Sequence, residues 1–279
     1  MSTRRAELGE FLKARRARVA PEDVGLPAGG RRRTPGLRRE ELAQLAGVGV
    51  TWYTWLEQGR PINASGQVLD AVAGTLRLNP IEREHLYRLA EATPVRPPSA
   101  TAGADAEVFG EILGALDPLP AVITNTRFDI VRANAAFSDL FHDWHGLPCI
   151  HKNLLWCLVT EPTARRQLLN YDTEVPYLVG RLRSAYGEHV GDPDWETDLE
   201  RLCKLSPEFA QLWSRHEVVA CSPRPRHVLH PAAGELHLTV TELAVPAHPD
   251  LLLFIETPAD EQTRARLLLT RRSVQPVEV

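Results

Sequence analysis

Residue types that could carry chemistry are concentrated between Arg39 and Gly59. Two short helices that meet at a steep angle need a small residue where they touch and a glycine with positive φ between them, and Ala43 and Gly47 stand at those positions. The side chains that would pack the corner are Leu42, Val48, Tyr53 and Leu56. This spacing predicts a helix-turn-helix, whose chemistry is noncovalent contact with base edges and phosphates.

The second helix of such a motif enters the major groove with its N-terminal end and its outward face. Threonine hydroxyls can hydrogen-bond to bases, valine or tryptophan can contact a thymine methyl, and arginines meet phosphates. The side chains that we expect to contact double-stranded DNA are Arg31, Arg32, Arg33, Arg38, Arg39, Gln44, Val50, Thr51, Trp52, Thr54 and Trp55. For Trp52, packing against the preceding helix is an equal alternative.

The charge distribution favours a polyanionic partner. Residues 1–60 hold 12 Lys and Arg against 7 Asp and Glu, so this part carries +5 and the remainder −9, although the net charge is −4. A basic end on an acidic body is typical of a nucleic-acid-binding module joined to another domain. A merely solvated charged face, or a helical hairpin without a role in DNA binding, is the alternative.

A second group of side chains that could do chemistry is the run of histidines and cysteines from His142 to Cys157, which also holds His145, Cys149 and His151. Structural zinc sites usually show closer, paired spacing, so we expect no metal there. The four cysteines of the chain form no CxxC pair, and reduced thiols are the expectation.

The sequence holds no GxSxG, P-loop, GxGxxG or HExxH motif. Asp192 and Asp194 are paired carboxylates, but a turn between helices explains them more simply. We therefore expect neither an enzyme nor a cofactor. No apolar stretch approaches the roughly 18 residues of a membrane span, and no secretory signal is present, which predicts a cytoplasmic, nucleoid-associated protein without a membrane partner.

Helices must position the recognition residues. The spacing of apolar residues predicts helices over 7–18, 38–46, 50–58, 68–78 and 81–92, with Gly59 ending the third. Residues 93–105 are rich in Pro, Ala, Ser and Thr, as a linker is. A chain of 279 residues is long enough for two domains. We expect an all-α DNA-binding domain over 1–92 and a linker over 93–105.

Residues 106–270 follow a different pattern. We expect helices over 108–116, 134–141, 163–170, 176–186, 195–203 and 207–215. Strands are expected over 121–125, 128–133, 226–230, 235–243 and 251–256. This order predicts an α+β domain with strands at both ends of a helical middle, followed by a polar tail over 271–279.

The stretch GRRRTPGLRREELAQLAGVGVTWYTWLEQGR closely resembles the head of the MmyB-like regulators, which join an XRE-type helix-turn-helix to a ligand-binding domain. The resemblance continues through VLDAVAGTLRLNPIEREHLYRLAE, PAVITNTRFDIVRANAAFSDLF, EFAQLWSRHEV and HPAAGELHLTV. Two positions depart from it. Gly49 stands where such proteins usually have a serine as helix N-cap, and Trp55 where a polar residue or arginine is expected.

The resemblance implies a PAS-like second domain, in which a sheet and helices enclose an apolar cavity for a small ligand of the fatty-acid type. The ligand-binding residues that we expect are Leu155, Trp156, Tyr177, Leu178, Leu182, Trp213, Arg215 and His216. Further candidates for the lining are Leu154, Leu158, Leu168, Leu169 and Leu212, although each of these side chains could be plain core. Arg215 and His216 would anchor a head group or close the pocket, or form an ion pair with an acid such as Glu217.

One helix-turn-helix reads only a few base pairs, so we expect a homodimer on a pseudo-palindromic operator, with the ligand favouring one dimer geometry. Two alternatives concern the second domain. It could be a platform for partner proteins, or a thiol or metal sensor.

Overall fold

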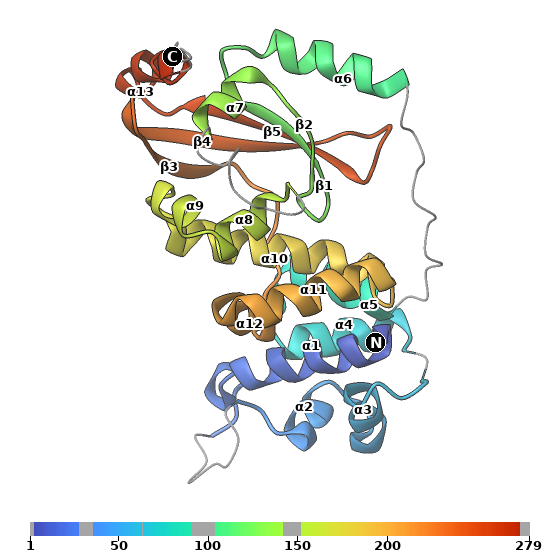
Figure 1. Cartoon of the computed structure of the whole chain (residues 1–279). Coiled ribbons are helices and arrows are strands. Elements are labelled where there is room, and N and C mark those ends of the chain that lie inside the picture. The colour runs from blue at the N-terminus through green and yellow to red at the C-terminus, as the bar shows by residue number, and fades with distance from the viewer. Residues whose placement is uncertain (1–2, 28–35, 63, 91–103, 142–151, 274–279) are drawn as a thin grey trace. The chain divides into compact units, whose positions relative to one another are not determined.

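The computed structural model describes residues 3–27, 36–62, 64–90, 104–141 and 152–273 (Figure 1). The chain divides into two compact units: Met1–Arg96 with Arg183–Ala220, and Pro97–Leu182 with Cys221–Val279. The domain boundary expected at the linker stays a prediction: residues 93–103 lie outside the described residues, and residues 104 and 105 belong to the helix Ala104–Ala115. Within the described residues, no helix is both long and apolar enough to cross a membrane.

The described elements of the first unit are helical. They are α1 (Arg4–Arg18), the short 3-10 helix η1 (Pro21–Val24), α2 (Arg39–Leu45), α3 (Val50–Glu57), α4 (Gly66–Thr75), α5 (Pro80–Ala90), the end of α10 (Tyr171–His189), α11 (Pro193–Leu205) and α12 (Pro207–Ser214). Polar side chains fix where several of them begin: the hydroxyls of Thr3 and Ser65 accept from the amides of Ala6 and Val68. The predicted all-α N-terminal region is confirmed.

The core of this unit forms where the apolar faces of α1, α2 and α3 meet. Phe11, Leu42 and Tyr53 are completely buried, and Leu12 and Leu56 lie beside them in the core. Burial of one such side chain stabilises the fold by about 1.5–3 kcal/mol. Leu42, Tyr53 and Leu56, which the sequence pattern selected for the corner, are therefore core residues, and Val48 is half-buried.

The second unit contains one five-stranded antiparallel sheet. Its strands are β1 (Ala121–Asn125), β2 (Ile130–Ala133), β3 (Arg224–His230), β4 (Gly234–Ala244) and β5 (Leu251–Pro258), in the order β2-β1-β5-β4-β3. Alternation in β4 buries Leu236, Leu238 and Val240 on one face, as the sequence predicts. The predicted α+β class, with strands at both ends of a helical middle, is confirmed.

Helices lie on both faces of this sheet. They are α6 (Ala104–Ala115), α7 (Ala135–Leu140), α8 (Leu154–Thr160), α9 (Pro162–Gln167), the first part of α10, α13 (Glu261–Leu267) and the 3-10 helix η3 (Thr270–Ser273). In Figure 1, α6 and α7 lie on one side of the sheet, and α8, α9 and the first part of α10 lie on the other. Leu113 of α6 packs with Ala121 and Ile123 of β1, which anchors α6.

Several boundaries differ from the expected ones. The strand expected to begin at Phe128 begins at Ile130, because Phe128 has a φ of 70° and lies in a turn. The helix expected from Pro176 begins at Tyr171, so the proline lies inside it and removes one backbone hydrogen bond. The helices α8 and α13 were not expected. Cys157 is disulfide-bonded, which corrects the expectation of reduced thiols, whereas Cys203 and Cys221 are free.

Candidate functional site

The turn between α2 and α3 has the geometry that the sequence predicts. Gly47 has a φ of 66°, and the amide of Val48 donates to the carbonyl of Ala43 at 2.9 Å. Gly49 is the N-cap of α3 and provides no side-chain hydrogen bond. Gly59, with a φ of 69°, follows the end of α3. Glycines thus set both ends of the second helix of the motif.

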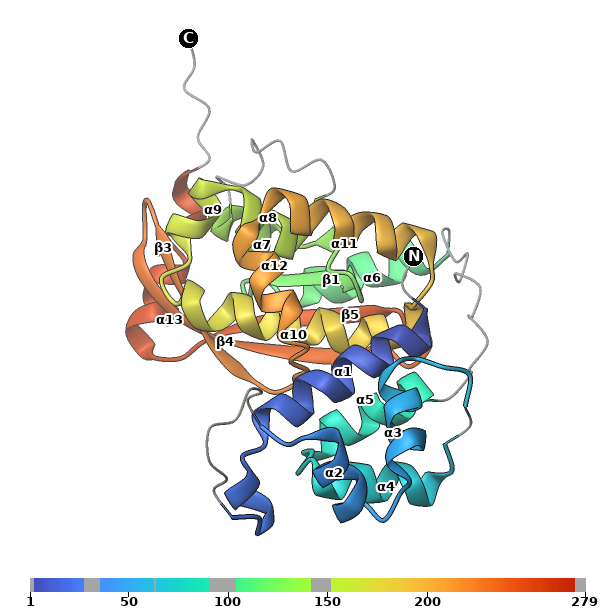
Figure 2. The same cartoon turned by 90° about the horizontal axis from the view of Figure 1, so that it is seen from below.

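Close backbone contact holds α3 against α1 (Figure 2). A Cβ atom added at Gly9 would lie 2.3 Å from the carbonyl oxygen of Glu57, and one at Gly59 would lie 2.9 Å from the carbonyl oxygen of Arg5. Only glycine fits such contacts without displacement of the backbone. Gly9 was missed by the sequence reading, although a glycine inside a predicted helix is a recognisable signal.

Glu57, at the end of α3, is the polar anchor of the motif. Its side chain is 0% exposed, and Arg16 donates to both of its carboxylate oxygens, at 2.9 and 2.7 Å. Arg39 adds a hydrogen bond of 3.0 Å. Burial alone would raise the pKa of Glu57, but the hydrogen bonds and charge of Arg16, with those of Arg39, lower it below its ordinary value. Glu57 is therefore ionised, and it fixes α3 to α1 and α2.

Several of the side chains expected to contact DNA lie exposed on the outward side of this motif. Val50 and Trp55 are 41% and 39% exposed, and Thr51 is exposed as well. Trp52 and Thr54 are half-buried. Of the other residues expected to contact DNA, Arg38 and Gln44 are exposed, and Arg39 is half-buried against Glu57. Arg31, Arg32 and Arg33 lie outside the described residues.

Trp55 also has a cationic neighbour. The guanidinium carbon of Arg60 lies 5.8 Å from the centre of its ring, within the range of a cation–π contact. This contact keeps a positive charge next to a large apolar surface on the exposed face of α3. The sequence pattern pointed to Trp55 but not to Arg60.

Trp213, Arg215 and His216, expected to bind a ligand, lie in the first unit. His216 Nδ1 is 3.3 Å from the Glu7 carboxylate of α1. The backbone carbonyl of Arg215 accepts from Arg15 of α1 at 2.7 Å. Arg183 pairs with Glu7, and its guanidinium lies 3.5 Å from the centre of the Trp213 ring. Arg183, Arg215 and His216 therefore join the segment 183–220 to α1, and Trp213 packs on Arg183.

Glu7 at the centre of this cluster is held ionised. Burial acts to raise its pKa, but the hydrogen bond to His216 and the charge of Arg183 lower it. Burial lowers the pKa of nearby His85 to about 3, so this histidine is neutral. The arrangement is a buried structural ion pair, and its carboxylate comes from α1 rather than from Glu217.

The second unit contains an apolar pocket. It is lined by Phe141, Leu154, Leu158, Leu168, Leu178 and Arg226. Its empty volume, including the part that is open to solvent, is about 280 Å³. Leu178 was among the ligand-binding residues expected, and Leu154, Leu158 and Leu168 were among the further candidates. Phe141 and Arg226 were missed. The closed part of the pocket has room for about one water molecule, so a larger ligand needs side chains to move.

The remaining expected ligand residues of this unit do not line the pocket. Leu155 and Trp156 are buried on α8, and Leu182 is buried on α10. Tyr177 is half-buried on α10, and its hydroxyl accepts from the amide of Ser222 at 3.2 Å. The sequence pattern thus located the helices of the pocket better than its individual side chains.

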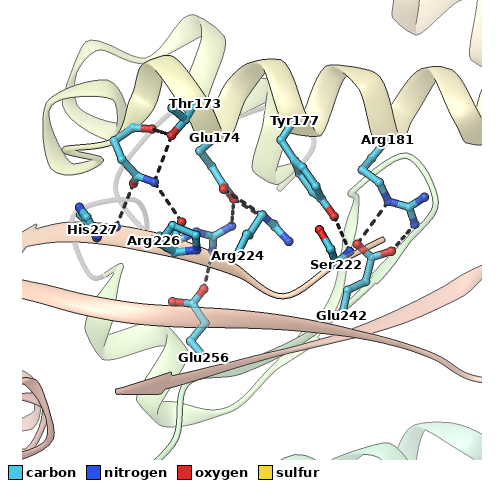
Figure 3. A network of polar contacts seen from close by, with 12 residues as sticks. Thr173, Glu174, Tyr177, Arg181, Ser222, Arg224, Arg226, His227, Glu242 and Glu256 are labelled. Carbon is cyan, nitrogen blue, oxygen red and sulfur yellow. Dashed lines mark hydrogen bonds and ion pairs between the residues drawn. The ribbon is translucent and has the colours of Figure 1, made fainter. Parts of the chain in front are cut away.

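Buried charges lie between α10 and the sheet (Figure 3). Glu174 accepts two hydrogen bonds of 2.9 Å from Arg224 and one of 2.5 Å from Arg226. Arg226 also pairs with Glu256 of β5. Arg224 and Arg226 point to the same face of β3 because they are two residues apart in a strand. The ion pairs link α10 to β3 and β5.

A separate pair, Arg181 with Glu242, lies farther along α10 and β4 (Figure 3). Among the described residues, no group of three or more His, Cys, Asp and Glu could hold a metal ion. Of the histidine and cysteine run considered for metal, His142, His145, Cys149 and His151 lie outside the described residues.

A helix-turn-helix held by buried ion pairs, together with an α+β unit that contains an apolar pocket, defines a transcription regulator that responds to a ligand. Residues 7–86 match a helix-turn-helix domain family, and residues 107–269 match the MmyB-like transcription regulator ligand binding domain. The second match covers more than half of the chain, and the chain belongs to the MmyB-like transcription regulators. No curated protein is similar enough to count as a match.

Proposed function

We propose that this protein reads a specific DNA sequence with the exposed face of α3, and that a small apolar ligand bound in the second unit changes its affinity for DNA. The main support for DNA reading is the exposure of Val50, Thr51 and Trp55 on a helix fixed by the Glu57 ion pairs. The fixed position of α3 matters because base readout depends on placing its side chains within hydrogen-bond distance of the bases. The proposed role is regulatory and not catalytic, and its site of action is the nucleoid.

We also propose that the protein binds as a homodimer to two half-sites about one helical turn apart. One α3 covers only a few base pairs, so a single copy would lack the affinity needed to select a site within a genome. Two copies related by a twofold axis would read a pseudo-palindrome.

The proposed ligand is fatty-acid-like. Five of the six residues that line the pocket are apolar, which suits an alkyl chain. The closed part of the pocket holds about one water molecule, far below the roughly 300–1,000 Å³ of usual ligand pockets, so binding would require the leucine side chains to move apart. A ligand that binds one conformation more tightly than another shifts DNA affinity by that difference.

At Cys203 and Cys221 the thiol-sensor alternative has less support. Burial raises the pKa of both the Cys203 and Cys221 thiols, and a raised pKa lowers the fraction of reactive thiolate at neutral pH.

The decisive experiment is binding to genomic DNA fragments, including those that flank the protein's own gene, at several salt concentrations. We expect selective retention by the wild type and its loss in the Thr51→Ala, Trp55→Ala double variant. Arg38→Ala should weaken binding to all sequences alike and lower the salt dependence. The matched control is Arg201→Ala, an exposed arginine on α11 of the same unit, which should leave binding unchanged. Equal retention of all fragments by the wild type would contradict sequence reading.

A further inference from the structure

The pocket of the second unit has one charged wall. Its sixth lining residue is Arg226, which is only 6% exposed and which pairs with both Glu174 and Glu256 (Figure 3). An alkyl chain that lies along the leucines of α8 and α10 has two ends, one at this arginine and one at the opening of the pocket. A head group at the inner end would meet a guanidinium that already has two carboxylate partners.

The charges around Arg226 balance. The cations are Arg224 and Arg226 of β3, and the anions are Glu174 of α10 and Glu256 of β5, all of them buried. The Arg181–Glu242 pair beyond them is balanced as well. An additional ionised carboxylate would give this cluster a net negative charge away from water, which costs several kcal/mol unless it is compensated. The ionised cluster thus favours a head group without charge.

Glu256, the partner of Arg226 on β5, does not line the closed pocket, but it has an acceptor that a head group can reach once side chains move. One of its carboxylate oxygens accepts from Arg226, and the other, Oε2, is buried without a hydrogen-bond partner among the described residues. Burial and the charge of Glu174 raise the pKa of Glu256, against the lowering effect of Arg226 and Arg224. Glu174, whose two oxygens are both occupied, has a lowered pKa despite its burial, because Arg226 and Arg224 stabilise its charge. Of the two carboxylates on Arg226, Glu256 is the one that accepts a proton more readily.

We propose that this pocket selects amphiphiles whose head group enters uncharged beside Arg226 and Glu256, so that a carboxylate ligand binds together with one proton, shared between its carboxyl group and Glu256. The inference rests on the proposed ligand-binding function and adds the head-group class: alcohols, amides and protonated acids. The proton comes from solvent, and only hydrogen bonds change. Binding of an acid is then linked to pH, whereas binding of an alcohol or amide of the same chain length is not.

The test measures the affinity of the full-length protein for decanoic acid and 1-decanol at pH 6, 7 and 8. Uptake of one proton predicts that the dissociation constant of the acid rises about tenfold per pH unit above the pKa of the acid. The alcohol serves as the control for other titrating groups, including the ten histidines of the chain. Its dissociation constant should stay within about twofold over the same range, a change far smaller than one bound proton would cause.

Variants locate the proton. In Glu256→Gln the acid no longer needs a proton, so its affinity should become independent of pH and exceed the wild-type affinity at pH 8. The matched control is Glu242→Gln, a buried carboxylate on the neighbouring strand that pairs with Arg181, and it should keep the wild-type pH dependence. If Glu256→Gln does not fold, calorimetry of the wild type in two buffers with different ionisation enthalpies still counts the protons taken up.

The outcomes separate the two proposals. Binding of the acid with no dependence on pH, or with no proton uptake, overturns the head-group inference but leaves a ligand pocket. A pH dependence that persists in Glu256→Gln overturns the assignment to Glu256. If neither compound binds at any pH, the proposed ligand-binding function fails, and the inference fails with it.

Discussion

Glu57 in the first unit and Glu256 in the second are both buried carboxylates that pair with arginine, yet their protonation is pushed in opposite directions. Both oxygens of Glu57 are occupied by Arg16, with a further hydrogen bond from Arg39, and its pKa is lowered. Glu256 has one unpartnered oxygen among the described residues, and its pKa is raised. Burial acts to raise the pKa of both carboxylates, and the donors that reach each one decide whether this effect is overcome. A buried carboxylate left short of donors has capacity for a ligand.

The substitution Glu57→Gln tests the contribution of the Glu57 ion pairs to stability. The variant leaves the buried charge of Arg16 without its counterion, so the free energy of unfolding should fall by about 3–5 kcal/mol, and selective DNA binding should be lost with it. Urea denaturation followed by tryptophan fluorescence measures the change. Glu40→Gln, an exposed glutamate on α2, is the control and should change stability by less than about 0.5 kcal/mol. A loss below 1 kcal/mol in Glu57→Gln would mean that the ion pairs are dispensable.

The backbone contact beneath Glu57 is tested by Gly9→Ala. The added Cβ would lie 2.3 Å from the Glu57 carbonyl oxygen, so α1 must shift away from α3, at a cost of about 1–3 kcal/mol. DNA affinity should fall as well. Gly114→Ala on α6 is the matched control, because nothing lies within 4 Å of its new Cβ. Removing a glycine from that helix should stabilise the protein by up to about 1 kcal/mol.

The opposite pKa shifts predict opposite pH dependences. Because the pKa of folded Glu57 lies below the ordinary value of 4.5, its contribution is present above that value and is lost as pH falls through the folded pKa. Because the pKa of folded Glu256 lies above 4.5, its contribution is complete below that value and is lost as pH rises through the folded pKa.

Urea denaturation of the wild type and of both variants from pH 2.5 to pH 8 would compare these pH dependences, because the Glu57 contribution changes below pH 4.5. Relative to wild type, Glu57→Gln should lose stability as pH rises, and Glu256→Gln should gain stability. Parallel trends in the two variants would remove the contrast between the two glutamates.

The smallest effect is expected for the half-buried Glu41. Glu41 accepts a hydrogen bond of 2.8 Å from the backbone amide of Arg38 at the start of α2. Glu41→Ala should cost roughly 0.5–1 kcal/mol through loss of this cap. Thermal melts compare it with Glu111→Ala, an exposed glutamate on α6. Equal melting temperatures for the two variants would show that the cap contributes nothing measurable.

The helix-turn-helix could be predicted because its determinants are local. The spacing of Ala43, Gly47 and Tyr53 within one short stretch fixes the corner, and the exposed positions on α3 follow from helix geometry. The five strands were also located from alternation and turn residues, with errors at the ends. The disulfide at Cys157 was missed because no spacing rule suggested it.

The charged wall of the pocket could not be predicted in the same way. Glu174, Arg226 and Glu256 come from a helix and two strands that the fold alone brings together, and arginine in a strand is typical of an exposed face. One signal in the sequence indicated that these arginines are buried. Arg224 and Arg226 share one face of β3 with Val228, and an apolar residue on that face indicates that it points to the core. The contacts of Arg215 and His216 with α1 could not be predicted either, because they link segments distant in sequence. The ligand roles expected for Trp213, Arg215 and His216 stay a prediction.

The cluster of Glu7, Arg183 and His216 decides whether the DNA-binding part can be separated from the rest. A fragment that ends before the expected linker would contain every residue of the helix-turn-helix match but none of the segment 183–220. Its α1 would keep Glu7 and Arg15 and lose Arg183, Trp213 and the carbonyl of Arg215. Glu7 and Arg15 would thus lose partners that they have in the whole chain, so we expect the fragment to be less stable than the complete unit. Fusion proteins that borrow this DNA-binding part should therefore contain both pieces of the chain.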